Sequence, residues 1–345
     1  MDKYVYVVLL NWRGWSDTIA CLESLYASSG PHMRIIVCDN ASGDGSLEHI
    51  EEWARGLIAA QIPEHPRLAR LTGQGVRQPV YQRLDRASAE AGDIDPRADL
   101  ILVENGANLG FAAGNNVGLR LALSQQDMDC VWLLNNDTMV EPDCLDKMRN
   151  ALSASGDRAV CGSVIHFFDQ PDVIQAIGGN RFNRLTGTAS CSEGRFLNEA
   201  DLPGAGETGI DVSYVSGCSM LLPRSFLEEV GLMGEEYFLY YEEIDWFTRA
   251  AGRFPICIAR DARLYHREGS SIGSPGWQRP ASSFSDYHLY RSRLIFMKKH
   301  YRRFLPICYL GAALDVGKRL LQGQFGNAAA VLGVLCGRRD RMAPL

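Results

Sequence analysis

The sequence lacks the usual marks of secretion, of a cysteine-based metal site and of a membrane span. None of its ten cysteines stands in a C-x-x-C pair, and most lie in apolar runs, which favours reduced, packed thiols over a zinc site or a disulfide framework. No apolar run approaches the roughly 20 residues of a transmembrane helix. The nearest, 304–314, contains Pro306. Lys3 leads directly into an apolar segment without a cleavage site, so we expect a first strand rather than a signal peptide, and a cytoplasmic protein.

The chain also lacks an excess of positive charge. Its 345 residues carry a formal net charge of −6 and the sequence pI is about 5.7, which argues against a dedicated nucleic-acid-binding protein. An anionic small molecule would need a local site, with a metal as the natural companion. The length suffices for one large α/β domain with an appendage, or for two domains.

Apolar runs alternate with helical patterns in the first half of the chain. Residues 4–10, 34–38 and 100–103 are such runs, and each is followed by apolar residues at helical spacing. This β-α-β-α order predicts a parallel sheet with helices on both faces. The intervening stretch 56–98 carries neither pattern, and we expect it to be an insertion or a long loop.

The segment 131–137, V-W-L-L-N-N-D, organises the chain. A short apolar run bounded by turn residues is typical of a strand buried on both faces of a parallel sheet. Ligands of open α/β sheets bind beyond the carboxyl ends of the strands, where Asn135, Asn136 and Asp137 would stand, with Asp137 as the natural metal ligand. The alternative is an Asx turn before a helix whose first turn contains Pro142.

Several elements are predicted in the second half. Residues 214–222 have the pattern of a strand with a close-approach glycine at 217, and a capping box over 225–228 opens a short helix that ends at Gly231. A final strand is expected at about 256–259, leading to a histidine at 266.

Three acidic residues fall close together at 242–245. At about 100° per residue, Glu243 lies inside the apolar arc of the predicted helix, whereas Glu242 and Asp245 lie outside it, and Asp245 can pair with Arg249 one turn on. An inward carboxylate is desolvated, which raises its pKa and makes it a better base. The alternative is a solvated acidic helix start favoured by the helix dipole.

His266 is the second candidate metal ligand. A lone histidine is more often a structural hydrogen-bonding group. Beside Asp137, however, it could complete a cation site of one carboxylate, one imidazole, phosphate oxygens and water, a mixed ligation that suits Mn²⁺ or Mg²⁺ better than zinc.

Seven segments in a fixed order carry a resemblance to a known family. They are V-V-L-L-N-W at 7–12, V-C-D-N-A-S-G-D-G-S at 37–46, N-L-G-F-A-A-G-N-N at 108–116, L-L-N-N-D at 133–137, Y-V-S-G-C-S-M-L-L-P at 214–223, F-L-Y-Y-E-E-I-D at 238–245 and H-R-E-G-S-S at 266–271. Together they resemble glycosyltransferase family 2, in particular the rhamnosyltransferase-like branch of bacterial surface-polysaccharide synthesis. The resemblance covers most of residues 4–300.

The resemblance implies a GT-A fold, a nucleotide-sugar donor and inverting transfer to a hydroxyl. It assigns the nucleoside contacts to Asn11 and Asp39, with Asn108 and Gly110 lining the same pocket. The segment 135–137 occupies the place of the family's D-x-D motif, with only the last carboxylate kept, so Asp137 would carry Mn²⁺ or Mg²⁺ while Asn135 and Asn136 contact the donor.

Two further residues take roles from the same resemblance. Glu243 stands where the family places its catalytic base, although aspartate is commoner there. His266 matches the family's metal or diphosphate histidine.

The substrates follow from the resemblance alone. It implies a dTDP- or UDP-sugar donor, with dTDP-rhamnose leading and galactofuranose or another hexose donor behind it, and a glycan or lipid-linked glycan acceptor. The alternative function is a catalytically lapsed nucleotide-sugar-binding or scaffolding subunit. A nucleotidyltransferase would carry a Gly-rich, basic signature after the first strand, where this chain has Asn11-Trp12-Arg13-Gly14-Trp15.

We divide the chain into a nucleotide-sugar-binding core at 1–225, an acceptor-side part with the catalytic base at 226–303, and a helical tail at 304–345. A basic cluster at 298–303 directly precedes the apolar run of the tail. Such a tail can pack on its own domain, pair with a second subunit or lie on the inner face of an anionic membrane.

Overall fold

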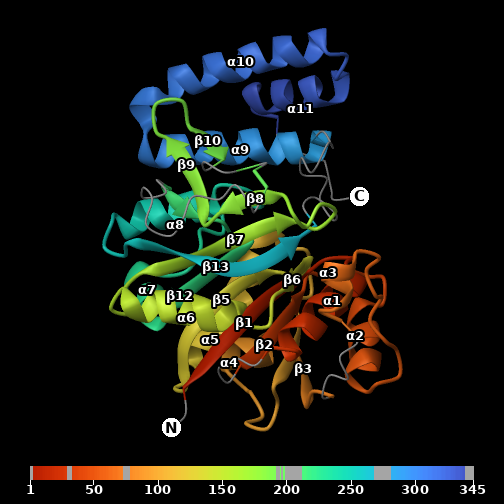
Figure 1. Ribbon diagram of the computed structural model, residues 1–345. Coiled ribbons are helices and arrows are strands. Elements are labelled where there is room, and N and C mark those ends of the chain that lie inside the picture. Colours follow the sequence, from red (N-terminus) through yellow and green to blue (C-terminus); the bar gives the residue numbers. More distant parts are fainter. Residues whose placement is uncertain are drawn as a thin grey trace.

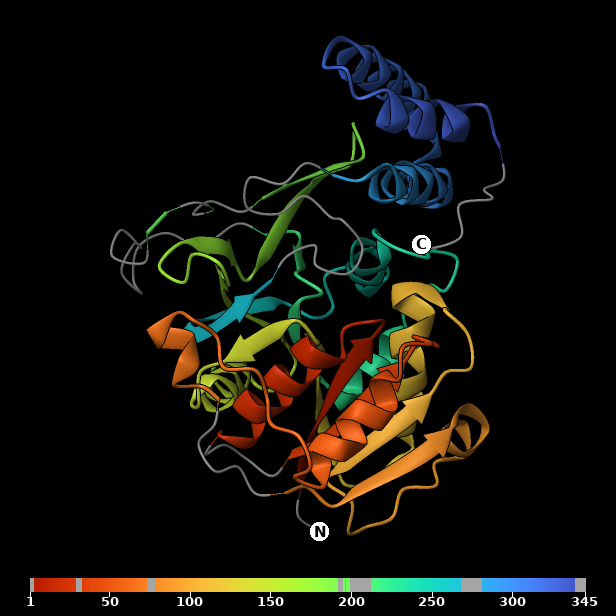
Figure 2. The ribbon, with the colours of Figure 1, turned by 90° about the vertical axis from the view of Figure 1, so that its right-hand side faces the viewer.

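The computed structural model describes residues 3–28, 33–72, 78–191, 195, 197–198, 212–267 and 281–338. A ten-stranded, mostly parallel sheet forms the centre, helices cover both of its sides, and three helices stack at one end (Figures 1 and 2). The predicted α/β architecture with a C-terminal helical extension is thereby confirmed. Part of the 266–271 motif and the end of the tail lie outside the described residues.

The strands order the chain in space. Those of the main sheet run β3-β4-β2-β1-β5-β12-β7-β13-β6, with β8 paired to β7, and a small second sheet runs β10-β9-β11. Their bounds are β1 (Tyr4–Asn11), β2 (Met33–Asp39), β3 (Tyr81–Asp85), β4 (Leu100–Glu104), β5 (Met128–Asn135), β6 (Thr138–Val140), β7 (Val160–Phe167), β8 (Ile174–Ile177), β9 (Gly179–Asn183), β10 (Thr188–Cys191), β11 (Tyr214–Val215), β12 (Ser219–Pro223) and β13 (Ile256–His266). The five strands from β3 to β5 are parallel.

Helices fill the connections between these strands. Their bounds are α1 (Trp15–Tyr26), α2 (Ser46–Ala54), α3 (Pro66–Ala69), α4 (Arg86–Ala91), α5 (Gly110–Ser124), α6 (Cys144–Ala154), α7 (Arg224–Val230), α8 (Glu242–Ala250), α9 (Ser283–His300), the 3₁₀ turn η2 (Arg302–Phe304), α10 (Leu305–Leu321) and α11 (Phe325–Leu335). None of the helices in the described part of the chain is long and apolar enough to cross a bilayer.

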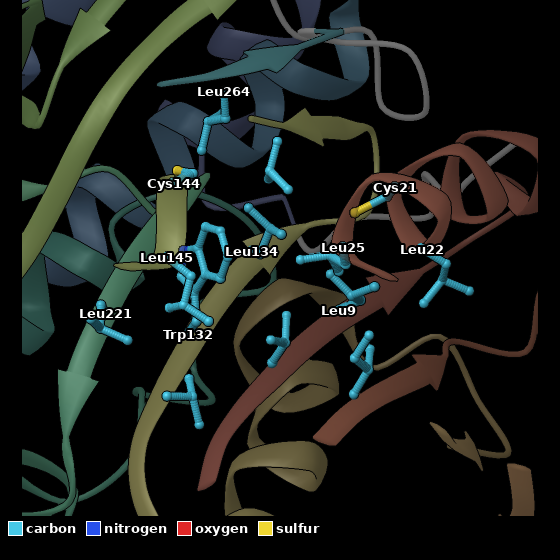
Figure 3. Packing of buried hydrophobic residues seen from close by; sticks show 14 of the residues in the cluster. Leu9, Cys21, Leu22, Leu25, Trp132, Leu134, Cys144, Leu145, Leu221 and Leu264 are labelled. Atoms are coloured by element: carbon cyan, nitrogen blue, oxygen red, sulfur yellow. The ribbon is translucent and has the colours of Figure 1, made fainter. Parts of the chain in front are cut away.

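Each central strand buries both of its faces, because successive side chains of a strand point to opposite sides. In β1, Leu9 packs with Trp132 beneath α1, α2 and α6 (Figure 3), and Val7 belongs to the same apolar cluster. Tyr6 and Val8 point the other way and pack beneath α5, α7 and α8. The continuous apolar runs of the sequence are therefore a consequence of two apolar cores, one on each side of the sheet.

The carboxyl ends of the central strands meet at one edge. The register pairs Asn11 with Asp39, Asp39 with Glu104, and Leu10 with Asn135. Four polar strand ends, far apart in the sequence, are thus brought to one rim of the sheet.

The structure corrects several details of the sequence reading. The stretch 56–98 is not a structureless loop, because it contains α3 and α4 and supplies the edge strand β3. The predicted strand 214–222 is broken at 216–218 into β11 and β12. β5 is parallel to β1 but antiparallel to β12. Pro142, expected in the first turn of the next helix, lies before α6. The helix α7 has no side-chain cap, because it begins at Arg224, one residue before the predicted cap Ser225, and its N-cap residue is Pro223.

Candidate functional site

Asp137 and His266 lie side by side at the polar rim. β13 pairs antiparallel with β6 and sets His266 opposite Thr138, so the histidine meets the turn that follows β5. His266 Nε2 is 3.2 Å from Asp137 Oδ1 and 3.2 Å from Asn135 Nδ2. The two predicted metal ligands therefore converge, with Asn135 beside them.

Gln175, which the sequence analysis did not identify, orients His266. Gln175 in β8 lies 3.0 Å from His266 Nδ1 through its Oε1 atom and is 4% exposed. A hydrogen bond from Nδ1–H to this amide leaves Nε2 as the metal-binding nitrogen of the neutral ring. The signal for Gln175 was a lone polar residue inside an apolar strand, which usually has a buried partner.

The surroundings of His266 favour positive charge on its ring. Burial alone would lower the pKa of His266, but the neighbouring Cys218 and Asp137 raise that pKa well above its ordinary value. A cation or a proton is thus stabilised at this point of the rim.

Asn11, Asp39 and Asn136 form a buried hydrogen-bond network. Asn11 Nδ2 donates to Asp39 Oδ1 at 2.7 Å, and Asn136 Nδ2 donates to Thr18 Oγ1 at 2.8 Å and to Asn11 Oδ1 at 3.3 Å. Asn11 is fully buried, whereas Asp39 lines a cavity of about 220 Å³ together with Glu104 and other residues. Hydrogen bonds thus join the three residues that were predicted to contact the nucleotide-sugar donor. Of these, Asp39 lines the cavity.

Asn108 and Gly110 adjoin this network through Asn40. Asn40 Nδ2 donates to the Gly110 carbonyl at 3.0 Å and lies 3.4 Å from Asn108 Oδ1. Gly110 has φ +78, and a Cβ there would come within 2.3 Å of the Phe238 carbonyl oxygen. The glycine is required for the close packing of α5 against the segment before α8.

Glu243 is fixed by the backbone of the 216–218 break. The Gly217 amide donates to Glu243 Oε1 at 3.2 Å, and a Cβ on Gly217 would lie 2.3 Å from the same oxygen. The close approach predicted at Gly217 is therefore made by the carboxylate itself. Burial raises the pKa of Glu243 above its ordinary value.

The same backbone break connects Glu243 with the metal-ligand pair. The carbonyl of Cys218, the residue after Gly217, accepts a hydrogen bond from the Asn135 amide at 3.0 Å. Consecutive Cα atoms are about 3.8 Å apart, so Gly217 and Cys218 hold Glu243 and the end of β5 in one place. The segment 217–218 thus contacts both the Glu243 carboxylate and the backbone at the end of β5, two residues before Asp137.

The expected orientation of the three acids is wrong, because Glu243, predicted to be the inward one, is only half-buried. Glu242 is 3% exposed and Asp245 is fully buried, although both were predicted to lie outside the apolar arc. The reason is that α8 is covered on a second side by α9, from which Lys299 and His300 contact Asp245 at 2.9 and 2.7 Å. The expected pairing with Arg249 is present at 2.7 Å.

Glu242 has a different environment from Glu243. Its Oε2 atom is buried and has no hydrogen-bond partner among the described residues. Burial, followed by the neighbouring charge of Glu243, raises the pKa of Glu242 well above its ordinary value. In the part of the chain that the structure describes, the Glu242 Oε2 atom therefore has no hydrogen-bond donor that stabilises a negative charge on it, whereas Glu243 Oε1 accepts a hydrogen bond from the Gly217 amide.

A larger cavity opens beside Asp137. Its volume is about 690 Å³, and its walls include Asp17, Asp137 and Arg267. Arg267 Nη1 lies 3.6 Å from Asp17 Oδ1. The sequence reading missed Arg267 as a cation that could face a negatively charged ligand, because a single arginine after a strand carries no distinguishing pattern.

The possible metal ligands at the rim can hold a hard divalent cation together with oxygen atoms from a bound ligand or water. No group of three or more histidine, cysteine, aspartate or glutamate side chains that could hold a metal occurs within the described residues. One carboxylate and one imidazole are available, and the other positions would need oxygen atoms from a ligand or water, as Mn²⁺ and Mg²⁺ commonly accept.

The sequence has relatives among proteins of known class. Residues 86–231 match the family described as Glycosyl transferase family 2. Over 152 residues the chain is 25% identical to the low-salt glycan biosynthesis hexosyltransferase Agl10 of Haloferax volcanii, an alignment that covers 44% of this chain and 46% of Agl10. The chain thus spans about half the length of this relative. Residues 86–231 thus resemble family 2, and both matches support a glycosyltransferase.

Two solved structures share the fold. GalNAc-T7, crystallised with UDP, GalNAc and Mn²⁺, has a TM-score of 0.57 and 12% identity over 92% of this chain and 51% of its own. The mannosyltransferase PcManGT of Pyrobaculum calidifontis, solved with GDP-Man and Mn²⁺, has a TM-score of 0.51 and 15% identity over 99% of this chain and 77% of its own. At such identities the likeness concerns the fold, which is GT-A-like.

Proposed function

We propose that this protein is a metal-dependent, inverting glycosyltransferase that moves a sugar from a nucleotide-sugar donor to a hydroxyl of a glycan or lipid-linked glycan. The observation that carries the proposal is the convergence of Asp137 and His266, 3.2 Å apart, next to the segment that holds Glu243. The family match and the hexosyltransferase relative support the same reaction class.

In this proposal the polar rim holds the donor. Asp39, at the wall of the smaller cavity, binds the nucleoside. Asn11 holds the Asp39 carboxylate by a hydrogen bond, and Asn136 in turn holds Asn11. Asn135 lies beside His266 and contacts the diphosphate. Because these amides are already hydrogen-bonded, the donor meets a site whose polar groups are oriented in advance.

Asp137 and His266 would hold a divalent cation, Mn²⁺ or Mg²⁺. When bound, the ion supplies positive charge that offsets the negative charge of the departing nucleoside diphosphate. Gln175 keeps His266 Nε2 directed at Asp137.

Glu243 accepts the proton of the acceptor hydroxyl. Burial raises the pKa of Glu243 above its ordinary value, which makes it a stronger base than an exposed glutamate. The Gly217 amide holds one carboxylate oxygen, which fixes the direction of the other. General-base catalysis of this kind typically contributes roughly 10²- to 10⁴-fold in rate.

The identity of the sugar is the finer part of the proposal. The resemblance to the rhamnosyltransferase-like branch alone supports dTDP-rhamnose as donor, and UDP- or GDP-linked hexoses are the other classes to be tried. The ligands of the two similar structures, UDP with GalNAc in one and GDP-Man in the other, support a nucleoside diphosphate as the leaving group.

The test is release of nucleoside diphosphate from a panel of dTDP-, UDP- and GDP-sugars, with Mn²⁺ and with a chelator. We expect turnover of at least one donor only with the metal, its loss in Glu243→Gln, and donor affinity changed less than about threefold in that variant. Glu242→Gln is the matched control, because Gln keeps the shape of a protonated carboxyl group. Donor binding without turnover for the unmodified chain would identify a binding or scaffolding subunit instead.

A further inference from the structure

Large exposed apolar side chains gather on the last two helices. Fourteen large apolar side chains are exposed in the described part of the chain, and eight of them fall between positions 307 and 332. These eight are Ile307, Tyr309, Leu310, Leu314, Leu320, Leu321, Phe325 and Leu332. Leu321 is 92% exposed and Leu314 is 67% exposed. Isolated exposed leucines are ordinary, but a concentration of this kind marks an interaction surface.

Six of these side chains lie on α10. The buried residues Cys308 and Ala312 share the side of the helix that packs inward. At about 100° per residue, Leu310, Leu314 and Leu321 lie on the opposite side. α10 is the outermost element and lies away from the central sheet (Figure 1), so its apolar face points away from the main domain.

The neighbouring helix α11 continues the surface. Its sequence, F-G-N-A-A-A-V-L-G-V-L, contains no charged residue. Ala328 and Val331 are buried, whereas Phe325 and Leu332 are 68% and 51% exposed. We call the exposed side chains of both helices, the eight named above, the outer apolar surface.

Positive charge accompanies this surface. Residues 301–338 contain five basic residues and a single acid, Asp315, although the whole chain has a net charge of −6. Arg319 is paired with Asp286 at 2.8 Å. The other four, Arg302, Arg303, Lys318 and Arg338, have no acidic partner among the described residues.

We propose that the outer apolar surface docks on an anionic lipid membrane. Apolar side chains on one helix face with unpaired cations beside them fit the boundary between acyl chains and phosphate headgroups. A second copy of this chain fits less well, because pairing two identical surfaces would bring the same cations together without acids to meet them. The occupant that complements both features is a bilayer with negative headgroups.

Docking would also orient the candidate site. α9 packs against α11 and α10, and it contacts the acidic helix through Lys299 and Asp245 and the preceding segment through Ser292, which donates to the Leu239 carbonyl at 2.8 Å. The helix that carries Glu243 is thus braced by the element under the docking surface. On the basis of the proposed function, this geometry suits an acceptor that is itself lipid-linked, although docking does not depend on that function.

The test is co-sedimentation of the full chain with vesicles of phosphatidylcholine alone or with about one third phosphatidylglycerol. We expect binding to the anionic vesicles and weaker binding as salt is raised. The double variant Leu310→Ser/Leu314→Ser should lose most of the bound fraction, while Leu57→Ser, at a site 68% exposed outside the surface, should bind like the unmodified chain. Arg302→Gln with Lys318→Gln should weaken partitioning roughly 25-fold, at about fivefold for each basic residue.

Two results would overturn the proposal. One is no binding to anionic vesicles at low salt, and the other is equal binding by the unmodified chain and the Leu310→Ser/Leu314→Ser variant. Sedimentation velocity completes the design: a dimer that this double variant dissociates, without vesicle binding, would assign the surface to a second copy. Donor turnover without vesicles is measured in parallel, so failure of docking is distinguished from failure of the proposed reaction.

Discussion

Substitution of Gly217 by alanine tests how Glu243 is held. A Cβ at this position would lie 2.3 Å from Glu243 Oε1, so one of the two groups must move by on the order of 1 Å. The carboxylate is the end of a flexible side chain and gives way more easily than the backbone. It would then lose the hydrogen bond from the Gly217 amide.

We expect Gly217→Ala to lower kcat and to leave the free energy of unfolding nearly unchanged. A misplacement of about 1 Å of a catalytic group costs roughly 10²-fold in rate, so kcat should fall by about that factor. Loss of one hydrogen bond costs about 1 kcal/mol of stability, and replacing glycine by alanine regains a similar amount from the unfolded chain. The free energy of unfolding and the donor affinity should therefore change little.

The assay is single-turnover transfer together with donor titration and urea unfolding. Gly311→Ala in α10 is the control, because its added Cβ meets only Arg293 Nη2 at 3.6 Å. Glu243→Asp should partly restore kcat in the Gly217→Ala background, since the shorter side chain makes room for the methyl group. Unchanged kcat in Gly217→Ala, or equal loss of donor affinity and turnover, would refute the role given to this contact.

Three further predictions concern groups around the site. Because burial raises the pKa of Glu243 and a base must be ionised, kcat/KM should rise with pH through a value above that of an ordinary glutamate; a plateau that extends down to about pH 4 would contradict this. Asp245→Asn should lower the free energy of unfolding in urea by about 3 kcal/mol, since it removes the buried partner of Lys299. Although burial alone would raise the pKa of Asp245, hydrogen bonds from Lys299 and its neighbours lower it. Its contribution to stability should therefore be full above the ordinary aspartate pKa and be lost as pH falls through the lowered value. Gln175→Leu should weaken Mn²⁺-dependent donor binding about 10- to 100-fold by calorimetry, because His266 loses the partner of Nδ1; an unchanged affinity would deny Gln175 this role.

The central strands were predictable because each one has to be apolar on both faces. β1, β2, β4 and β5 appear in the sequence as continuous apolar runs, and their polar ends mark the rim. Short edge elements such as β6 and β8 carry too few residues to show a pattern, yet β6 sets His266 beside Asp137 and β8 supplies Gln175.

The orientation of the acidic residues could not be read from a helical wheel. That reasoning assumes a single buried side, whereas α8 is covered by the sheet core on one side and by α9 on another. Asp245 is buried because Lys299 and His300, more than 50 residues later, satisfy it. Contacts of this length depend on the tertiary arrangement, which the local pattern does not contain.

The measurement that tests the account most directly is the affinity of the nucleotide-sugar donor with and without Mn²⁺, determined by calorimetry for the unmodified chain and for Asp137→Asn. Asp17→Asn, which changes another carboxylate of the same cavity, is the control. We predict that Mn²⁺ raises donor affinity in the unmodified chain and in the control but has little effect in Asp137→Asn. An equal effect of Mn²⁺ in all three proteins would contradict the placement of the cation between Asp137 and His266.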